Sequence, residues 1–129
     1  MLRVAVVHAL RGARSRVADI TRYVCDVLRG EGLEHAEVTI VFIGSRYCRI
    51  LNRDYLGHDY VTDVLSFPLG EAEILEGEVY VNSDRARQQA RAFGVTPANE
   101  TARLVAHGVL HLVGYDDRNL RDAARMRLR

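Results

Sequence analysis

The chain has 129 residues, enough for one hydrophobic core and too few for two, so we expect a single domain spanning residues 1–129. Apolar residues account for 48% of the sequence and charged residues for 27%, a balance that excludes a disordered or fibrous protein. No apolar stretch reaches the roughly 20 residues needed to cross a bilayer, and the N-terminus lacks a signal-peptide pattern, so we expect a cytoplasmic protein without membrane contact. The formal net charge of +1 gives no global reason to bind nucleic acid, so RNA binding would require a local patch.

Hydrophobic periodicity predicts both strands and helices along the chain. The predicted strands cover residues 2–8, 36–43, 63–67 and 76–82, and the predicted helices cover 14–30, a segment opened by Gly44 and Ser45, 83–93, about 97–113 and about 118–128. Thr96 and Pro97 form a typical N-cap and first-turn pair, and Gly114 suits a left-handed end to the same helix. We therefore predict an α+β (mixed α/β) fold, a small mixed four-stranded sheet covered by about five helices, with a metal site at the end of a helix.

The cysteine and arginine residues give weaker indications about metal binding and RNA binding. Cys25 and Cys48 lie in separate predicted helices without a CxxC spacing, so we expect reduced, structural thiols rather than a zinc-thiolate site. All basic residues other than histidine are arginine, and they are densest after residue 117. That C-terminal segment either meets a phosphate backbone or forms a solvated helix face.

One segment has the spacing of metal ligands: His107-Gly-Val-Leu-His111-Leu-Val-Gly114-Tyr-Asp-Asp117. Residues four apart on a helix project from one face, about 6 Å apart along the axis, so both imidazoles can reach one ion. Gly114 lets the backbone turn back, which can bring a third ligand from Asp116 or Asp117 to that ion. Two histidines and one carboxylate leave a coordination position open, as in catalytic rather than structural zinc sites.

This spacing overlaps that of the metzincin proteases, whose residue after the first histidine is a glutamate that acts as general base. Gly108 occupies that position here. A peptidase would therefore need another acid, such as Glu78 or Glu100, to fold into the site, and the sequence gives no support for that.

The segment HGVLHLVGYDD resembles the signature HGxLHLxGYDH of the YbeY family, in which three histidines bind zinc. Leu51-Asn52 with Tyr55, and the block TDVLSFP from Thr62 to Pro68, match two further blocks of that family. The segment Gly77-Glu-Val-Tyr-Val81 also lies where the family has a strand. Because the blocks keep their order across residues 36–117, the resemblance is specific.

Two positions depart from the family pattern. Asp117 replaces the third histidine, which keeps an oxygen ligand but adds negative charge and lowers the Lewis acidity of the metal. Leu56 replaces an arginine that follows the tyrosine in most members and contacts RNA or the transition state. Arg53, one helical turn earlier, is either a substitute for that arginine or an ordinary surface residue.

The resemblance implies a single-strand-specific, zinc-dependent endoribonuclease that acts in rRNA processing, at the 3′ end of the small-subunit rRNA, and in ribosome quality control. It implies one Zn²⁺ per chain, held by His107, His111 and Asp117, with Asp116 supporting the site without binding the ion. Such an ion lowers the pKa of a bound water and polarises a phosphoryl oxygen, so the three ligands would act in catalysis through that water. The implied partners are single-stranded rRNA, the small ribosomal subunit and its assembly proteins.

Residues outside the metal segment leave alternatives open. Ser66 and the amides of residues 62–68 either bind phosphate or ribose from an edge strand or belong to a plain core strand. Asp63 either orients the catalytic water or caps a turn. His35 and His58 fall in predicted loops, where we expect solvent exposure and assign no role.

A different class of function fits the missing arginine. The chain would then be a ribosome-assembly factor, stabilised by its metal, that binds rRNA without cutting it. Tight metal and RNA binding without turnover would distinguish this factor from a nuclease.

Overall fold

The computed structural model describes residues 1–9, 17–70 and 74–115. The strands are β1 (Leu2–His8), β2 (Ala36–Ile43), β3 (Val64–Pro68) and β4 (Leu75–Asn82). The helices are α1 (Val17–Gly30), α2 (Ser45–Leu56), α3 (Ser83–Phe93) and α4 (Pro97–Val113). This mixed α/β architecture confirms the predicted fold class, with four helices in the described part; the helix predicted over about 118–128 lies outside the described residues.

The four strands form one mixed sheet in the order β1-β2-β4-β3. β1, β2 and β4 are parallel, and β3 runs antiparallel to β4, with Ser66 opposite Val79. Beyond the last antiparallel pair, the Leu69 N–H donates to the Glu76 carbonyl at 2.8 Å. Among the described residues, β3 pairs only with β4, so its other side is a free edge of the sheet in this part of the chain.

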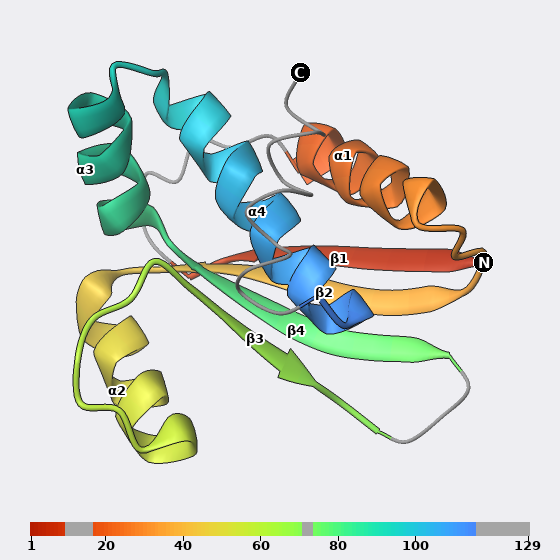
Figure 1. The fold of residues 1–129 in the computed structure, drawn as a ribbon, viewed down its shortest axis with the longest axis horizontal. Coiled ribbons are helices and arrows are strands. Elements are labelled where there is room, and N and C mark those ends of the chain that lie inside the picture. Colours follow the sequence, from red (N-terminus) through yellow and green to blue (C-terminus); the bar gives the residue numbers. More distant parts are fainter. Residues whose placement is uncertain (10–16, 71–73, 116–129) are drawn as a thin grey trace.

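The helices lie on both faces of the sheet, as Figure 1 shows. α1 and α4 cover one face, where they bury the main core with the alternate residues of β2 and β4, among them Ile40, Phe42, Val79 and Val81. α2 packs against part of the opposite face through a smaller cluster that contains Ile43, Cys48, Leu51 and Leu65. α3 packs beside α4.

The helix ends follow capping rules that are visible in the sequence. Asn82 caps α3 by accepting hydrogen bonds from the N–H groups of Asp84 and Arg85, and Gly94 ends that helix with a φ of 67°. Gly57 ends α2 with a φ of 73°, in the left-handed region that glycine adopts at little cost. In the part of the chain that the structure describes, no helix is both long and apolar enough to span a membrane.

The two cysteines differ enough in burial to report on folding. Cys48 is fully buried, its Sγ donates to the Thr62 carbonyl at 3.3 Å, and burial raises the pKa of the thiol, whereas Cys25 is half-buried. We expect iodoacetamide to alkylate Cys25 first and Cys48 at least about 100-fold more slowly, because the reactive thiolate at Cys48 is both scarce and covered. Mass spectrometry of a native time course measures both rates, and the urea-unfolded chain is the control in which they converge. Equal rates in the native protein would contradict the buried position of Cys48.

Candidate functional site

The two histidines of the predicted metal segment lie on the helix α4. Its first turn is fixed by Thr96, whose Oγ1 accepts a hydrogen bond from the Asn99 N–H at 3.1 Å, and by Pro97 at the first helical position. Ten and fourteen residues after Pro97 on this helix, His107 is half-buried and His111 is exposed. Both side chains line one pocket of about 270 Å³. The prediction that they share a helix face agrees with this geometry.

Gly108, between the histidines, lies where α4 approaches the sheet without room for a side chain. A Cβ at this position would lie 2.4 Å from Val79 Cγ1, 3.1 Å from Val64 Cγ2 and 3.2 Å from Ser66 Oγ. Ser66 Oγ also donates to the Gly108 carbonyl at 2.9 Å, so helix and strand are joined where the side chain is missing. Position 108 therefore faces the packed sheet and leaves no room for a carboxylate.

Neither of the two acids considered as the general base of a peptidase lies in the pocket. Glu100 is 2% exposed and accepts two hydrogen bonds of 2.7 Å from Arg103, one turn along the same helix. Glu78 alternates with Gly77 and Val79 on β4, so it lies on the sheet face opposite α4. No acid considered for the metalloprotease alternative lies in the pocket, which removes the support for that function.

The pocket follows the free edge of β3, with the end of α4 on one side and the end of α2 on the other. Two residues of α2, three residues of the α2–β3 loop and three of β3 complete its lining: Asn52, Leu56, His58, Tyr60, Thr62, Val64, Leu65 and Ser66. Of the two alternatives for residues 62–68, the edge-strand position is the observed one, whereas binding of phosphate or ribose stays a prediction. Val64 contributes to the main core and Leu65 to the smaller cluster, so packing and pocket roles coexist in this strand.

Buried amide side chains hold the loop wall of the pocket. Asn52, 1% exposed, donates from Nδ2 to the Tyr60 carbonyl at 3.0 Å. Asn82, 0% exposed, donates from Nδ2 to the Thr62 carbonyl at 3.0 Å, and Cys48 donates to the same oxygen. The loop backbone is thus tied to α2 and to the end of β4.

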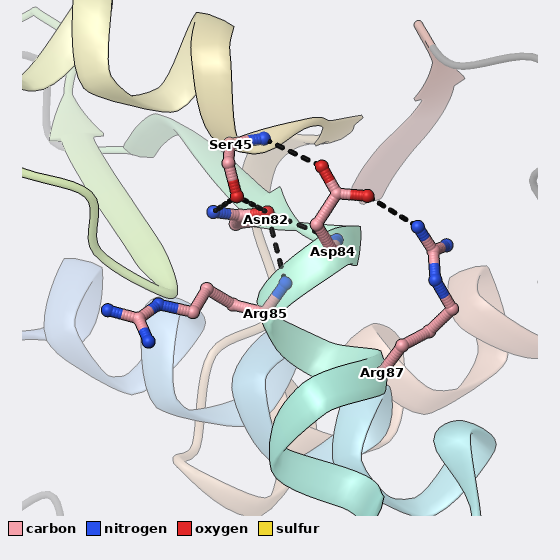
Figure 2. A network of polar contacts seen from close by, with 5 residues as sticks. All are labelled: Ser45, Asn82, Asp84, Arg85 and Arg87. Atoms are coloured by element: carbon pink, nitrogen blue, oxygen red, sulfur yellow. Dashed lines mark hydrogen bonds and ion pairs between the residues drawn. The ribbon is translucent and has the colours of Figure 1, made fainter.

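Asn82 is also the centre of the polar network in Figure 2. Its Nδ2 donates to Ser45 Oγ at 3.1 Å, while Asp84 Oδ2 accepts from the Ser45 N–H at 2.9 Å, which joins the N-termini of α2 and α3. Arg85 of α3 extends the network to the loop, because its Nη2 donates to the Val61 carbonyl at 3.5 Å. Neither asparagine was predicted to support the site, although Asn52 belongs to the LN..Y block.

The remaining predicted site residues are spread around the pocket or outside it. Asp63 is not among the lining residues; its Oδ2 accepts a hydrogen bond of 3.2 Å from Gln89, and its carbonyl accepts one of 2.8 Å from the Asn82 N–H. Arg53 is paired with Asp54 at 3.0 Å and also lies outside the lining.

The position that lacks the family arginine does line the pocket. Leu56 is 45% exposed there. His58, to which the sequence interpretation gave no role, lines the pocket too, and its predicted exposure is confirmed. His35 instead contacts the N-terminal amine of Met1.

Asp117, the third ligand of the predicted metal site, lies outside the described residues, as does Asp116. Among residues 1–9, 17–70 and 74–115, no three His, Cys, Asp or Glu side chains are grouped to hold a metal ion. α4 ends at Gly114, whose φ of 122° is positive as predicted but larger than the usual left-handed value of about 57°. Two imidazoles on one pocket wall are suitable metal donors, and a complete site requires a further ligand.

Comparison with known proteins agrees with the motif and the fold. The family model described as "Endoribonuclease YbeY" matches residues 9–129. The chain belongs to this family. It is 43% identical to the endoribonuclease YbeY of Chlorobium luteolum over 83% of this chain and 78% of the relative, and 42% identical to that of Pelotomaculum thermopropionicum over 88% and 77%.

A solved structure is similar to this chain in three dimensions. The solution structure of TM1509 from Thermotoga maritima superposes with a TM-score of 0.65 at 25% identity and covers 97% of this chain and 86% of its own. The family model and the curated relatives confirm the resemblance of the HGVLHLVGYDD and TDVLSFP blocks to YbeY as family membership.

Proposed function

We propose that this YbeY-family chain is a metal-dependent endoribonuclease that cuts single-stranded RNA and matures the 3′ end of small-subunit rRNA. The observation that carries the proposal is the joint presence of His107 and His111 in a pocket along the free edge of β3, in a chain that belongs to an endoribonuclease family. The proposal includes a single cytoplasmic domain, with the small ribosomal subunit and its assembly proteins as partners, and a role in ribosome quality control.

The proposed metal is one Zn²⁺, held by His107, His111 and Asp117. The two imidazoles suit zinc, and Asp117 follows Gly114 at the distance from which a turning backbone can supply a third ligand. Such an ion would activate water for attack at phosphorus and polarise a phosphoryl oxygen. Asp116 is proposed to support the ligands through hydrogen bonds.

The chain's own groups would position the RNA strand along β3. Backbone N–H groups on the free side of this edge strand are donors suited to phosphate or ribose oxygens. Ser66 already donates its hydroxyl hydrogen to the Gly108 carbonyl, so it can only accept from the substrate, for instance from a ribose hydroxyl. The hydrogen-bonded loop of residues 57–63 would keep the opposite wall in place.

The test is cleavage of a single-stranded RNA that spans the small-subunit rRNA 3′ region. Zinc-loaded protein should cut it, and the same protein treated with a chelator should not, with recovery on adding zinc. Asp117→Ala should lose metal affinity and cleavage together, whereas Asp116→Ala should retain metal and lose part of the activity. Full zinc occupancy with no cleavage would instead support the non-cutting assembly factor, which Leu56 favours because it leaves the pocket without the family arginine.

Restoring that arginine gives a separate prediction about RNA binding. Leu56→Arg should strengthen binding of a single-stranded, 2′-O-methylated RNA about fivefold, because the new guanidinium can pair with a phosphate at the pocket. The plot of log affinity against log salt concentration should become steeper by about 0.7. Fluorescence anisotropy at several salt concentrations measures both quantities.

Leu69→Arg is the matched control for this variant. Leu69 is also 45% exposed but lies outside the pocket lining, so the same charge should have a smaller effect there. Equal gains in the two variants would show that the added charge acts nonspecifically and that position 56 has no special access to RNA.

A further inference from the structure

Two exposed aromatic rings stand on the loop wall of the pocket. The rings of His58 and Tyr60 are stacked, with centroids 5.4 Å apart and planes 13° from parallel, and Tyr60 Oη lies 3.2 Å from His58 Nδ1. Tyr60 is 56% exposed, and both residues line the pocket that contains His107 and His111. One composite aromatic surface therefore borders the two histidines of α4.

The backbone under these rings is fixed although the rings are exposed. The His58 N–H donates to the Asn52 carbonyl at 3.1 Å, and the Asn52 side chain donates to the Tyr60 carbonyl at 3.0 Å. Between them, Asp59 accepts hydrogen bonds of 2.8 and 3.3 Å from Arg49. All three residues of the segment 58–60 are thus anchored to α2, so a ligand that uses the rings would have little ordering entropy to overcome.

The charges beside the rings favour stacking over phosphate binding. Arg49 and Arg53, in the last two turns of α2, are ion-paired with Asp59 and Asp54. The next position of α2 that lines the pocket is Leu56, which has no charge. This wall offers aromatic and apolar surface, which suits the face of a nucleobase.

We propose that the His58–Tyr60 pair is a binding site for one unpaired nucleobase of the RNA, which stacks on the exposed ring surface while the adjacent backbone lies along β3. The inference rests on the proposed function, because it takes RNA as the ligand of the pocket. Stacking is tolerant of base identity, since every base has a π-face, so the site selects single-stranded over paired RNA rather than a sequence.

The experiment compares binding of a 2′-O-methylated single-stranded RNA to the zinc-loaded full chain and its variants by fluorescence anisotropy. Tyr60→Ala should bind about tenfold more weakly, and Tyr60→Phe should bind like the unchanged protein because the ring is kept. The slope of log affinity against log salt should stay the same in Tyr60→Ala, because no phosphate contact is removed. Tyr47→Ala, at an exposed tyrosine outside the pocket lining, should have no effect.

A second probe, the same oligonucleotide with abasic nucleotides, separates base from backbone contacts. The unchanged protein should bind it more weakly than the intact RNA, and Tyr60→Ala should cause no further loss. Equal affinity of Tyr60→Ala and unchanged protein for intact RNA, or an equal loss on both probes, would overturn the inference. This binding assay contains no cleavage step, so the two proposals can fail separately. If binding depends on Tyr60 but the protein does not cut RNA, the stacking site is retained and the nuclease is rejected. If the protein cuts RNA but binding does not depend on Tyr60, the nuclease is retained and the stacking site is rejected.

Discussion

Replacing His111 by alanine is expected to abolish RNA cleavage while the protein stays folded. His111 is exposed on α4 and lines the pocket, so its truncation removes a proposed metal ligand without leaving a cavity in the core. Zinc affinity should fall by more than about 100-fold, because even residues that only support metal ligands contribute 10- to 100-fold. Isothermal titration with zinc and the RNA cleavage assay measure the two losses, and circular dichroism checks the fold.

His35→Ala is the matched control for the His111 variant. His35 is also exposed, but it lies outside the pocket lining and contacts the N-terminal amine of Met1. Zinc affinity and cleavage should be unchanged in this variant. If His111→Ala kept its zinc affinity, His111 would not be a metal ligand. Loss of cleavage in that case would place His111 in contact with RNA instead.

The main elements of the fold were predictable because local rules set them. Periodicity gave β2 and α3 with their observed bounds, and Thr96, Pro97 and Gly114 marked the two ends of α4. Residues 14–16, predicted as the start of the first helix, lie outside the described residues, and α1 is described from Val17 to Gly30. The order of the strands had no local signal, since it depends on which faces the helices cover.

The candidate site was predictable only where the chain carries a spaced motif. His107 and His111 share a pocket because four residues make about one helical turn, a relation that can be read from sequence. The loop that carries His58 and Tyr60 could not be assigned to the site from sequence spacing. It lies near the α4 histidines because β3 packs between α2 and α4. The same packing places Asp63 against Gln89, outside the pocket lining, although it lies next to Thr62 and Val64 of that lining.

The second large effect is expected from Gly108→Ala, which should destabilise the protein by about 2–3 kcal/mol. Alanine is normally favoured over glycine inside a helix by about 1 kcal/mol, so helix propensity alone would predict that this substitution stabilises the protein. We expect the opposite because the new Cβ would lie 2.4 Å from Val79 Cγ1 and force α4 away from the sheet. Urea unfolding followed by circular dichroism gives the free energy of unfolding.

A double-mutant cycle identifies the contact responsible. Val79→Ala removes the Cγ1 atom that the new Cβ would meet, so the Gly108→Ala/Val79→Ala variant should be more stable than the sum of the single losses by about 1 kcal/mol or more. Gly32→Ala is the comparison for glycine chemistry alone, because a Cβ there meets nothing within 4 Å and only the φ of 80° is strained. Additive losses at positions 108 and 79 would contradict the close approach of helix and sheet.

The Gly108 contact also links stability to chemistry. It sets the distance of α4 from β3, and therefore the position of His107 and His111 relative to the strand edge along which RNA is proposed to lie. Gly108→Ala should consequently lower zinc affinity and cleavage under conditions where the variant is still folded. Because the same contact leaves no space for a carboxylate at position 108, a glycine here both builds the pocket and prevents this helix from carrying the general base of a peptidase.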